Sequence, residues 1–245
     1  ILSSDRFEQI SAYSFDGIHD NISISNDTSL TILGDISISS WVKTHGYNDV
    51  SNYQTILSKR AEYYHWEYSC GISYHAPNDH DGHFITAKGN GPNVQDQLWS
   101  QNPADVNEWE HWVTVYSGDS IKIYRNGVFD SSRLNSVQPV AQNCDILIGQ
   151  AMSESINEQF FGSLDDIGIW DRALTENEVL ELYLQLEGCT DPLAFNYNAD
   201  ANIDDESCYP IIHGCMNPIA VNYVDPIEDS HIDINTEDGS CLFSA

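Results

Sequence analysis

Positive charge is what this sequence lacks most. Its 245 residues include 9 Lys and Arg against 38 Asp and Glu, a formal net charge of -29. Nucleic acids and anionic lipid surfaces are bound through Lys and Arg that displace counterions, so this charge excludes both as partners. Carboxylates in such excess either form a solvated acidic surface or are neutralised by bound cations. Calcium, which prefers oxygen ligands, is the cation that we expect.

Long apolar runs are also missing. No stretch of about 18 apolar residues occurs, so the sequence predicts no membrane insertion. The first residues, Ile1 to Asp5, lack the basic and apolar pattern of an export signal. If the protein is exported, we therefore expect its signal sequence to have been removed before this numbering begins.

Catalytic motifs are absent as well. A retaining glycosidase needs two carboxylates about 5 Å apart, and the hydrolase motif Glu-x-Asp-x-x-Glu does not occur. The chain has no nucleophile elbow, zinc motif or phosphate-binding loop. The sequence therefore predicts a protein that is not an enzyme.

Six cysteines are present, but none has the Cys-x-x-Cys spacing of a zinc site. Disulfides in an oxidising compartment are the better interpretation, so we expect a secreted or cell-surface protein. Four cysteines lie in the last 57 residues. The other two, Cys70 and Cys144, are predicted to bond to each other; the alternative is two separate buried thiols.

Short alternating strands separated by Gly, Asn and Asp fill residues 13–174. In segment 36–42 the isoleucines and Val42 share one face, and two serines share the other with Trp41, as in a strand with one buried face. Segment 62–75 alternates at length, with the aromatic residues at 64, 66, 68 and 74 on one face. Many short strands with turn signals and no helix between them predict an all-β antiparallel sandwich.

One helix is predicted at the end of the sandwich. Thr175 and Glu178 have the spacing of a capping box. Val179, Leu182 and Leu186 follow at helical spacing, together with Tyr183, and form an apolar stripe that can dock on the sandwich. We expect this domain to span residues 1–187.

An internal repeat begins after this helix, where residues 188–245 include eleven Asp and Glu but no Lys or Arg. Segment 188–197, GCTDPLAFNY, matches segment 214–223, GCMNPIAVNY, and each copy closes with an acidic stretch and Ser-Cys. The opening and closing cysteines imply the bonds Cys189–Cys208 and Cys215–Cys241. Units this small need a disulfide, a metal or both, because they cannot bury a sufficient core. We predict one unit over residues 188–210 and another over 211–245.

The sandwich region resembles the laminin-G-like, concanavalin-A-like jelly-roll family, in its branch related to pentraxins. The resemblance covers residues 9–186 and rests on six motifs: YSFDG at 13–17, ISSWVK at 38–43, TILSK at 55–59, WEHWVTV at 109–115, IYRNG at 123–127 and FGSLDDIGIWDRAL at 161–174. It implies a two-sheet jelly roll whose rim loops or concave face bind a ligand, often a glycan. It also implies a calcium ion near the meeting point of the first and last strands.

The tail resembles Gly-Cys-Thr-Asp-Pro repeats of secreted bacterial surface proteins and, more distantly, thrombospondin type 3 repeats. One departure concerns the sandwich. After segment 148–150, pentraxins carry a Glu-Gln-Asp cluster that binds calcium and ligand, whereas this chain reads Ala151-Met152-Ser153. A pentraxin-like double-calcium site is therefore not expected.

A first calcium site is predicted in the sandwich. Asp16 and Asp20 flank a turn at Gly17 that can fold both carboxylates toward one point, with Asn21 beside them. The family's topology implies that Asp165, or Asp166 in its place, lies alongside in the closing strand. The alternative is that these side chains cap turns and backbone amides.

Further calcium ligands are predicted in the tail. In the first unit, oxygen-bearing side chains at alternate positions can surround one cation: Asp200, Asn202, Asp204 and Glu206. The second unit offers a looser set: Asp225, Asp229, Asp233, Asn235 and Asp238. The alternative is an acidic spacer held by its disulfides alone.

A glycan-binding surface is predicted over segment 63–83. Aromatic rings can stack on sugars and carboxylates can orient hydroxyls, so the predicted contacts are Tyr63, His65, Trp66, His75, Asp79 and Asp81. The alternative is that the aromatic rings of this strand pack in the core. The sequence thus predicts a calcium-dependent extracellular module that binds a glycan or a surface glycoprotein. The alternative function is a calcium-stiffened stalk of a larger surface protein, with no ligand of its own.

Overall fold

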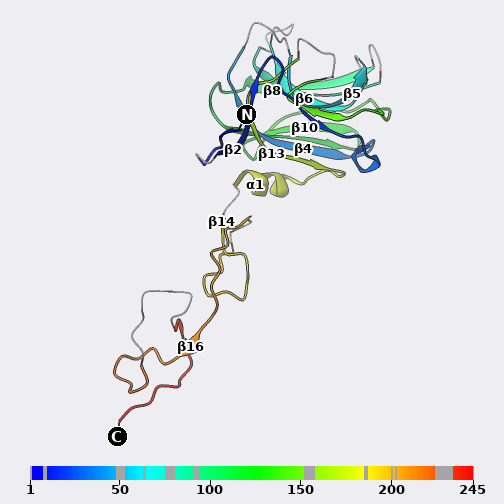
Figure 1. The fold of residues 1–245 in the computed structure, drawn as a ribbon. Helices are drawn as coiled ribbons and strands as arrows, with labels where there is room; N and C mark the ends of the chain where they lie inside the picture. The colour runs from blue at the N-terminus through cyan, green and yellow to red at the C-terminus, as the bar shows by residue number, and fades with distance from the viewer. Residues whose placement is uncertain are drawn as a thin grey trace. The chain divides into compact units, whose positions relative to one another are not determined.

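The computed structural model describes residues 2–7, 10–47, 53–62, 65–74, 81–90, 94–151, 158–184, 187–199, 201, 203–223 and 234–244. The chain divides into two compact units, Ile1–Tyr183 and Leu184–Ala245 (Figure 1). This division lies four residues before the boundary expected from the sequence. No helix among the described residues is long and apolar enough to cross a membrane.

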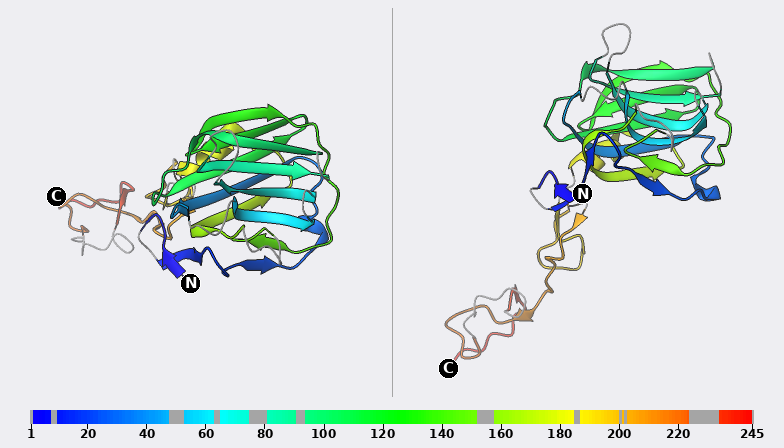
Figure 2. Two further views of the ribbon diagram at one scale, coloured as in Figure 1. Left: turned by 90° about the horizontal axis from the view of Figure 1, so that it is seen from above. Right: turned by 45° about the horizontal axis from the view of Figure 1, so that its top comes forward.

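The first unit is built from two antiparallel sheets, which Figures 1 and 2 show as stacked layers. The seven-stranded sheet has the order β1 (Leu2–Ser4), β2 (Ile10–Asp16), β13 (Phe161–Trp170), β4 (Ile36–Thr44), β9 (Glu110–Ser117), β10 (Ser120–Arg125) and β11 (Val128–Leu134). The six-stranded sheet has the order β3 (Ile22–Ile24), β12 (Ile146–Ile148), β5 (Tyr53–Glu62), β6 (His65–Ser73), β7 (His83–Gly89) and β8 (Gln95–Pro103). A 3-10 turn, η1 (Thr28–Leu30), precedes β4. The predicted two-sheet jelly-roll sandwich is confirmed.

The core lies between the two sheets. β4 contributes Ile36, Ile38 and Val42, as its alternation predicts, and they meet a buried cluster from the facing sheet. Phe84 of β7 stacks on Trp112 of β9 with ring centroids 4.7 Å apart. Because both rings are almost fully buried, this pair joins the two sheets within the core.

The opposite face of β4 is also buried, so the expectation of a half-buried strand is wrong. The helix α1 (Glu176–Leu184) follows the sandwich in the chain, and Tyr183 stacks on Trp41 of β4 at 5.7 Å. The Ser37 hydroxyl donates to the Arg172 carbonyl and accepts from the Leu174 amide, each at 2.9 Å. Ser37 therefore holds the segment that leads into the helix rather than facing water, and the Ser39 hydroxyl lies 2.7 Å from the His111 ring.

The predicted capping box of α1 is confirmed. The Thr175 hydroxyl accepts a hydrogen bond from the Glu178 amide at 3.3 Å, and the Glu178 carboxylate accepts one from the Thr175 amide at 2.8 Å. Arg172 also donates to this carboxylate at 2.7 Å. Val179 is fully buried on the sandwich and Leu182 packs against the same cluster, which confirms this part of the docking stripe; Leu186 lies outside the described residues.

The predicted strand at 62–75 begins later than expected. Glu62 ends β5, and β6 starts at His65. Lys59 pairs with Tyr68 but Arg60 pairs with Trp66, which leaves Glu67 as the extra residue of a β-bulge. The bulge changes the alternation, so Tyr68 belongs to the core cluster between the sheets whereas Trp66 does not.

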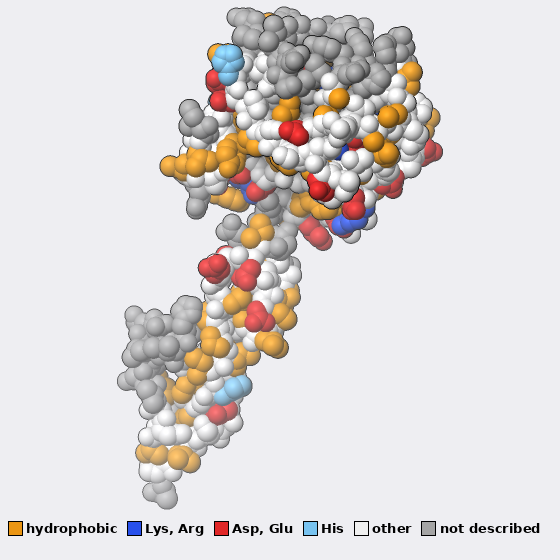
Figure 3. Space-filling view, turned by 45° about the vertical axis from the view of Figure 1, so that its right-hand side comes forward, with side chains coloured by type: hydrophobic (Ala, Val, Ile, Leu, Met, Phe, Trp, Pro, Cys, Tyr) orange, Lys and Arg blue, Asp and Glu red, His pale blue; other side chains and the backbone are white. Residues whose placement is uncertain are grey.

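The second unit has two similar halves. Each is held by a two-residue parallel ladder, β14 (Glu187–Gly188) with β15 (Ile203–Asp204), then β16 (His213–Gly214) with β17 (Thr236–Glu237). Both predicted disulfides, Cys189–Cys208 and Cys215–Cys241, are confirmed. Apolar side chains are exposed along the face of this unit seen in Figure 3, so burial contributes little to its stability.

Candidate functional site

A row of mostly small side chains crosses the outer face of the six-stranded sheet. One residue from each strand pairs with the next in register: Ser23, Leu147, Ser58, Ser69, Ala87 and Gln97. Their chain neighbours Leu57, Cys70 and Leu98 pack in the core. Because side chains alternate along a strand, the row faces away from the core and forms a floor, in which Ser58 is fully buried and the other five residues line pockets.

Two pockets open over this floor. One, of about 470 Å³, extends over β5 to β8, and its polar and aromatic lining includes Tyr53, Arg60, Trp66, Gln95, Gln97 and Glu158. The other, of about 390 Å³, is lined by Asn21, Ser23, Asp145, Leu147 and Gln150 among others, and again by Arg60. The two pockets meet at Arg60, and we call them together the outer-face groove. Five strand spacings separate β3 from β8, so the groove is about 24 Å long.

Arg60 and Glu158 form the ion pair at the middle of the groove. Arg60 donates from both terminal nitrogens to the Glu158 carboxylate, with Nη1 to Oε1 at 3.4 Å and Nη2 bonded to Oε2. The two side chains are only 3% and 15% exposed. The guanidinium also lies over the Trp66 ring, 5.6 Å from its centroid. Among the described lining residues, Arg60 is the one cationic side chain, and Glu158 neutralises it.

Amide side chains lie at the β8 end of the groove. The Gln95 side-chain oxygen is buried and has no hydrogen-bond partner within the described part of the chain. Gln97 projects from the same face two residues later, while Asp96 between them turns inward and accepts bonds from the Ser136 and Val137 amides. The unpartnered oxygen is free to accept a hydrogen bond from a ligand hydroxyl.

The predicted glycan contacts are only partly described by the structure. Trp66 lines the groove, although it is 8% exposed. Asp81 is exposed before β7 and lines neither pocket. Tyr63, His75, Asp79 and the side chain of His65 lie outside the described residues. Arg60, Glu158, Gln95 and Gln97 were not predicted as site residues, although the alternation of the segment QDQLW at 95–99 places both glutamines on one face.

The predicted calcium site at Asp16 is a self-capping turn in the structure. One Asp16 carboxylate oxygen accepts from the amides of Ile18, His19 and Asp20, at 2.8, 2.9 and 3.2 Å. The His19 amide is the largest of the influences that lower the pKa of Asp16. The Asp20 carboxylate accepts from the Asp16 amide at 3.0 Å, and Asn21 donates to the His19 carbonyl.

Asp165 does not join this turn, so its inclusion in the site is wrong. Asp16 pairs with Phe161 in β13, and Asp165 lies four residues further along, about 13 Å away. Its carboxylate instead lies 3.6 Å from Arg6, which also contacts Asp166 at 2.8 Å. The closing strand that the family's topology implies, β13, does lie beside β2. Asp165, however, is not the residue of β13 that lies opposite Asp16.

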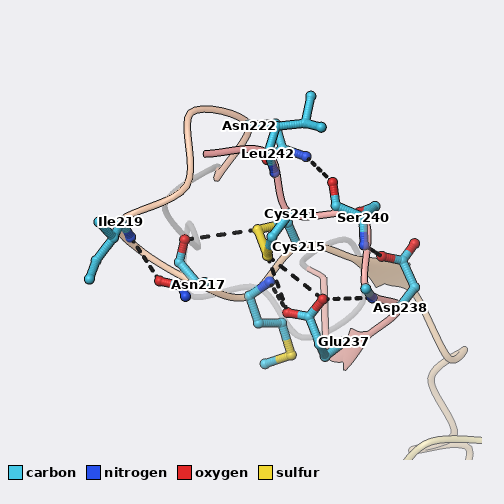
Figure 4. The surroundings of a disulfide bond; sticks show 11 residues. Cys215, Asn217, Ile219, Asn222, Glu237, Asp238, Ser240, Cys241 and Leu242 are labelled. Carbon is cyan, nitrogen blue, oxygen red and sulfur yellow. Dashed lines mark hydrogen bonds between the residues drawn. A yellow bond between two sulfur atoms is a disulfide. The ribbon is translucent and has the colours of Figure 1, made fainter. Parts of the chain in front are cut away.

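Several oxygen-bearing side chains of the tail accept hydrogen bonds from backbone amides. Asp205 and Asp238 each accept from the amide two residues on at 2.9 Å, and Asp204 accepts from the Glu206 amide at 3.1 Å. Asn235 accepts from the Ile212 amide at 2.8 Å. The Glu237 carboxylate accepts from the Met216 and Gly239 amides at 2.7 and 2.8 Å, and Figure 4 shows it beside the Cys215–Cys241 disulfide.

The tail calcium sets are therefore not assembled among the described residues. There, the only close group of three His, Cys, Asp or Glu is Cys215, Glu237 and Cys241, whose sulfurs are bonded to each other. The other proposed ligands lie outside the described residues: Asp200, Asn202, Asp225, Asp229 and Asp233. Calcium binding stays a prediction.

The predicted bond between Cys70 and Cys144 is not formed. Both thiols are free, with Cys70 on β6 in the core and Cys144 two residues before β12. Because β5 lies between β6 and β12, these strands are about 9–10 Å apart, beyond the reach of roughly 7 Å between Cα atoms that a disulfide allows. Burial raises the pKa of Cys70 to about 12, which keeps it an unreactive thiol.

Three solved structures illustrate what the fold is similar to. The binding domain of Paraclostridial mosquitocidal protein 1 has a TM-score of 0.59 and 16% identity, over 75% of this chain and 45% of that one. Domain 4 of the arabinanase AbnA from Geobacillus stearothermophilus, in complex with arabinotriose, has a TM-score of 0.54 and 20% identity, over 74% of this chain and 80% of that one. The sialidase module CBM40 from Ruminococcus gnavus, bound to α2,3-sialyllactose, has a TM-score of 0.57 and 11% identity, over 70% of this chain and 96% of that one.

The sequence comparisons agree with the fold. No curated protein has a matching sequence. The likeness of the tail to thrombospondin type 3 repeats stays a prediction. Residues 16–180, more than half of the chain, match the concanavalin A-like lectin/glucanases superfamily, and the chain belongs to that family.

Proposed function

We propose that this protein is an extracellular glycan-recognition module that binds an oligosaccharide in the outer-face groove. The observation that carries the proposal is the groove itself. It combines an aromatic ring, amide side chains and a fixed guanidinium over a floor of small residues. A few convergent polar groups in a concave, partly apolar site are typical of ligand-binding sites. The function is binding without chemical turnover.

Two further observations support the proposal. Domains of the same fold are bound to arabinotriose in the arabinanase and to α2,3-sialyllactose in the sialidase. The two disulfides of the tail fit an oxidising, extracellular compartment. Glycans and surface glycoproteins are the partners available there.

A glycan array probed with the whole chain tests the proposal. We expect retention of at least one oligosaccharide class and its loss in the variant Gln97→Ala. The matched control is Gln101→Ala, on the same strand but outside the groove lining. A chain that binds no glycan with or without calcium would contradict the proposal and favour the stalk.

We also propose that calcium stabilises the protein, because the net charge of -29 otherwise repels itself. Exposed Asp204 and Glu206 are among the candidate ligands. A bound ion stabilises only the folded state, so chelation with EDTA should lower the thermal midpoint by several degrees. An unchanged midpoint, with unchanged array binding, would remove calcium from the proposal and leave the groove untouched.

A further inference from the structure

We infer that the outer-face groove is selective for uncharged oligosaccharides, and that Glu158 sets this selectivity by occupying Arg60. The inference rests on the proposed function and adds the chemical class of the ligand. Arg60 lines both pockets, so a ligand that extends along the groove passes over it.

An unoccupied guanidinium at this point would favour acidic sugars. Arginine presents a planar fork of donors that matches a carboxylate, so it is the usual residue for binding one. Here Glu158 already accepts one hydrogen bond from each terminal nitrogen and supplies the opposite charge. The Glu158 backbone carbonyl accepts from the Thr55 amide at 3.2 Å, which fixes the pair to β5.

Displacing Glu158 is unfavourable because the pair is largely buried. Its side chains are 3% and 15% exposed. A ligand carboxylate that replaced Glu158 on Arg60 would leave the Glu158 carboxylate desolvated and without its counter-charge. A sugar hydroxyl does not compete for the guanidinium in this way.

The rest of the described lining also disfavours anions. Asp145 lies at the β3 end of the groove, where it accepts from the Ser23 hydroxyl at 2.9 Å and the Asn26 amide at 3.0 Å. Arg60, Glu158 and Asp145 together carry one net negative charge, within a chain of formal charge -29. The unpartnered Gln95 oxygen needs a donor, which a hydroxyl supplies and an ionised carboxylate lacks.

The test compares matched neutral and acidic probes by calorimetry on the whole chain. The probes are neutral oligosaccharides retained on the array and the same oligosaccharides carrying one uronate or sialate; lactose and α2,3-sialyllactose form one such pair. We expect the neutral member to bind at least about tenfold more tightly, the size of one charge-assisted contact. Raising NaCl from about 50 to 500 mM should change its Kd less than about twofold, because screening acts on charges.

The variant Glu158→Gln should shift the ratio of acidic to neutral affinity by about tenfold or more toward the acidic probe, since it frees Arg60. The matched control Glu181→Gln makes the same change in α1, on the seven-stranded sheet, and should leave the ratio unchanged. Circular dichroism and the thermal midpoint check that the variant is folded. If it is not folded, the salt dependence of the Kd of the wild-type protein for the neutral probe tests the inference instead.

The possible failures are distinct. An acidic probe that binds wild-type protein as tightly as its neutral partner would overturn the inference while the proposed binding function stands. An unchanged ratio in folded Glu158→Gln would remove Glu158 as the source of selectivity. Failure of every probe to bind, neutral or acidic, would contradict the proposed function itself.

Discussion

The sandwich and the tail are held together in different ways. The sandwich buries aromatic and aliphatic side chains between two sheets, with Trp112, Tyr68 and Phe84 among the largest. The tail leaves large apolar residues exposed, Leu193 by 79% and Ile219 by 82%, and buries the opening cysteine of each half instead, Cys189 and Cys215. Burial stabilises the first unit, whereas covalent links and side-chain caps on backbone amides stabilise the second.

The caps of the tail explain its sequence repeat. Asn196 and Asn222 each donate to a Ser carbonyl at 2.9 Å, that of Ser207 or Ser240, and each accepts from the amide two residues beyond that serine. Each half thus uses the asparagine at the equivalent position to join its opening segment to the residues on either side of its closing cysteine. The repeated asparagine therefore serves the backbone, and five carboxylates of the tail also accept from backbone amides: Asp191, Asp204, Asp205, Glu237 and Asp238.

The largest effect expected from this comparison is on the sandwich core. Trp112→Ala removes a fully buried ring that stacks on Phe84, so it should lower the free energy of unfolding of the sandwich by about 3–5 kcal/mol. Urea unfolding followed by tryptophan fluorescence measures the change. The tail should keep its disulfides and its protease resistance; loss of both units together would show that they do not unfold independently.

A second effect is confined to the tail. Cys189→Ser and Cys215→Ser open loops with sequence separations of 19 and 26, and each bond stabilises its unit by roughly 3 kcal/mol in the chain-entropy description. With almost no apolar core to compensate, each unit should become sensitive to limited proteolysis. Cys144→Ser is the matched control, because this thiol is free. Protease resistance of the tail after reduction would show that contacts other than the disulfides hold it.

More of the fold than of the candidate site could be predicted from the sequence. Alternation and turn residues were enough for the strands, the spacing of Thr175 and Glu178 for the helix cap, and the repeated cysteines for both tail disulfides, because each pattern lies within a short stretch of sequence. The face of β4 that carries Ser37 and Trp41 was misjudged, since only the tertiary structure shows that Tyr183 covers Trp41. The bulge at Glu67 and the pairing of Arg60 with Glu158 depend on residues up to 98 positions apart, and no local pattern marks them.

The smallest expected effect concerns the pH dependence of the sandwich. Burial is the main cause that lowers the pKa of His111 to about 4; Arg6 lowers it further and Asp166 raises it. Because its ordinary value is near 6.5, the unfolded state binds more protons between these values. Stability should be complete above about pH 6.5 and fall as the pH drops toward 4, by about 2 kcal/mol at pH 5.

Unfolding in urea at pH 7 and pH 5 measures this loss, and His111→Gln should abolish most of it. The Ser39 hydroxyl, 2.7 Å from the ring nitrogen Nε2 of His111, can bond the glutamine amide instead. His19→Gln is the control, because His19 is exposed on the turn after β2. An equal loss in the His111 variant would assign the acid sensitivity to carboxylates of the sandwich. Proteolysis of the tail at the same two pH values completes the comparison. Hydrogen bonds from Ser207 and Ser240 lower the pKa values of Asp205 and Asp238, so both carboxylates stay ionised at pH 5.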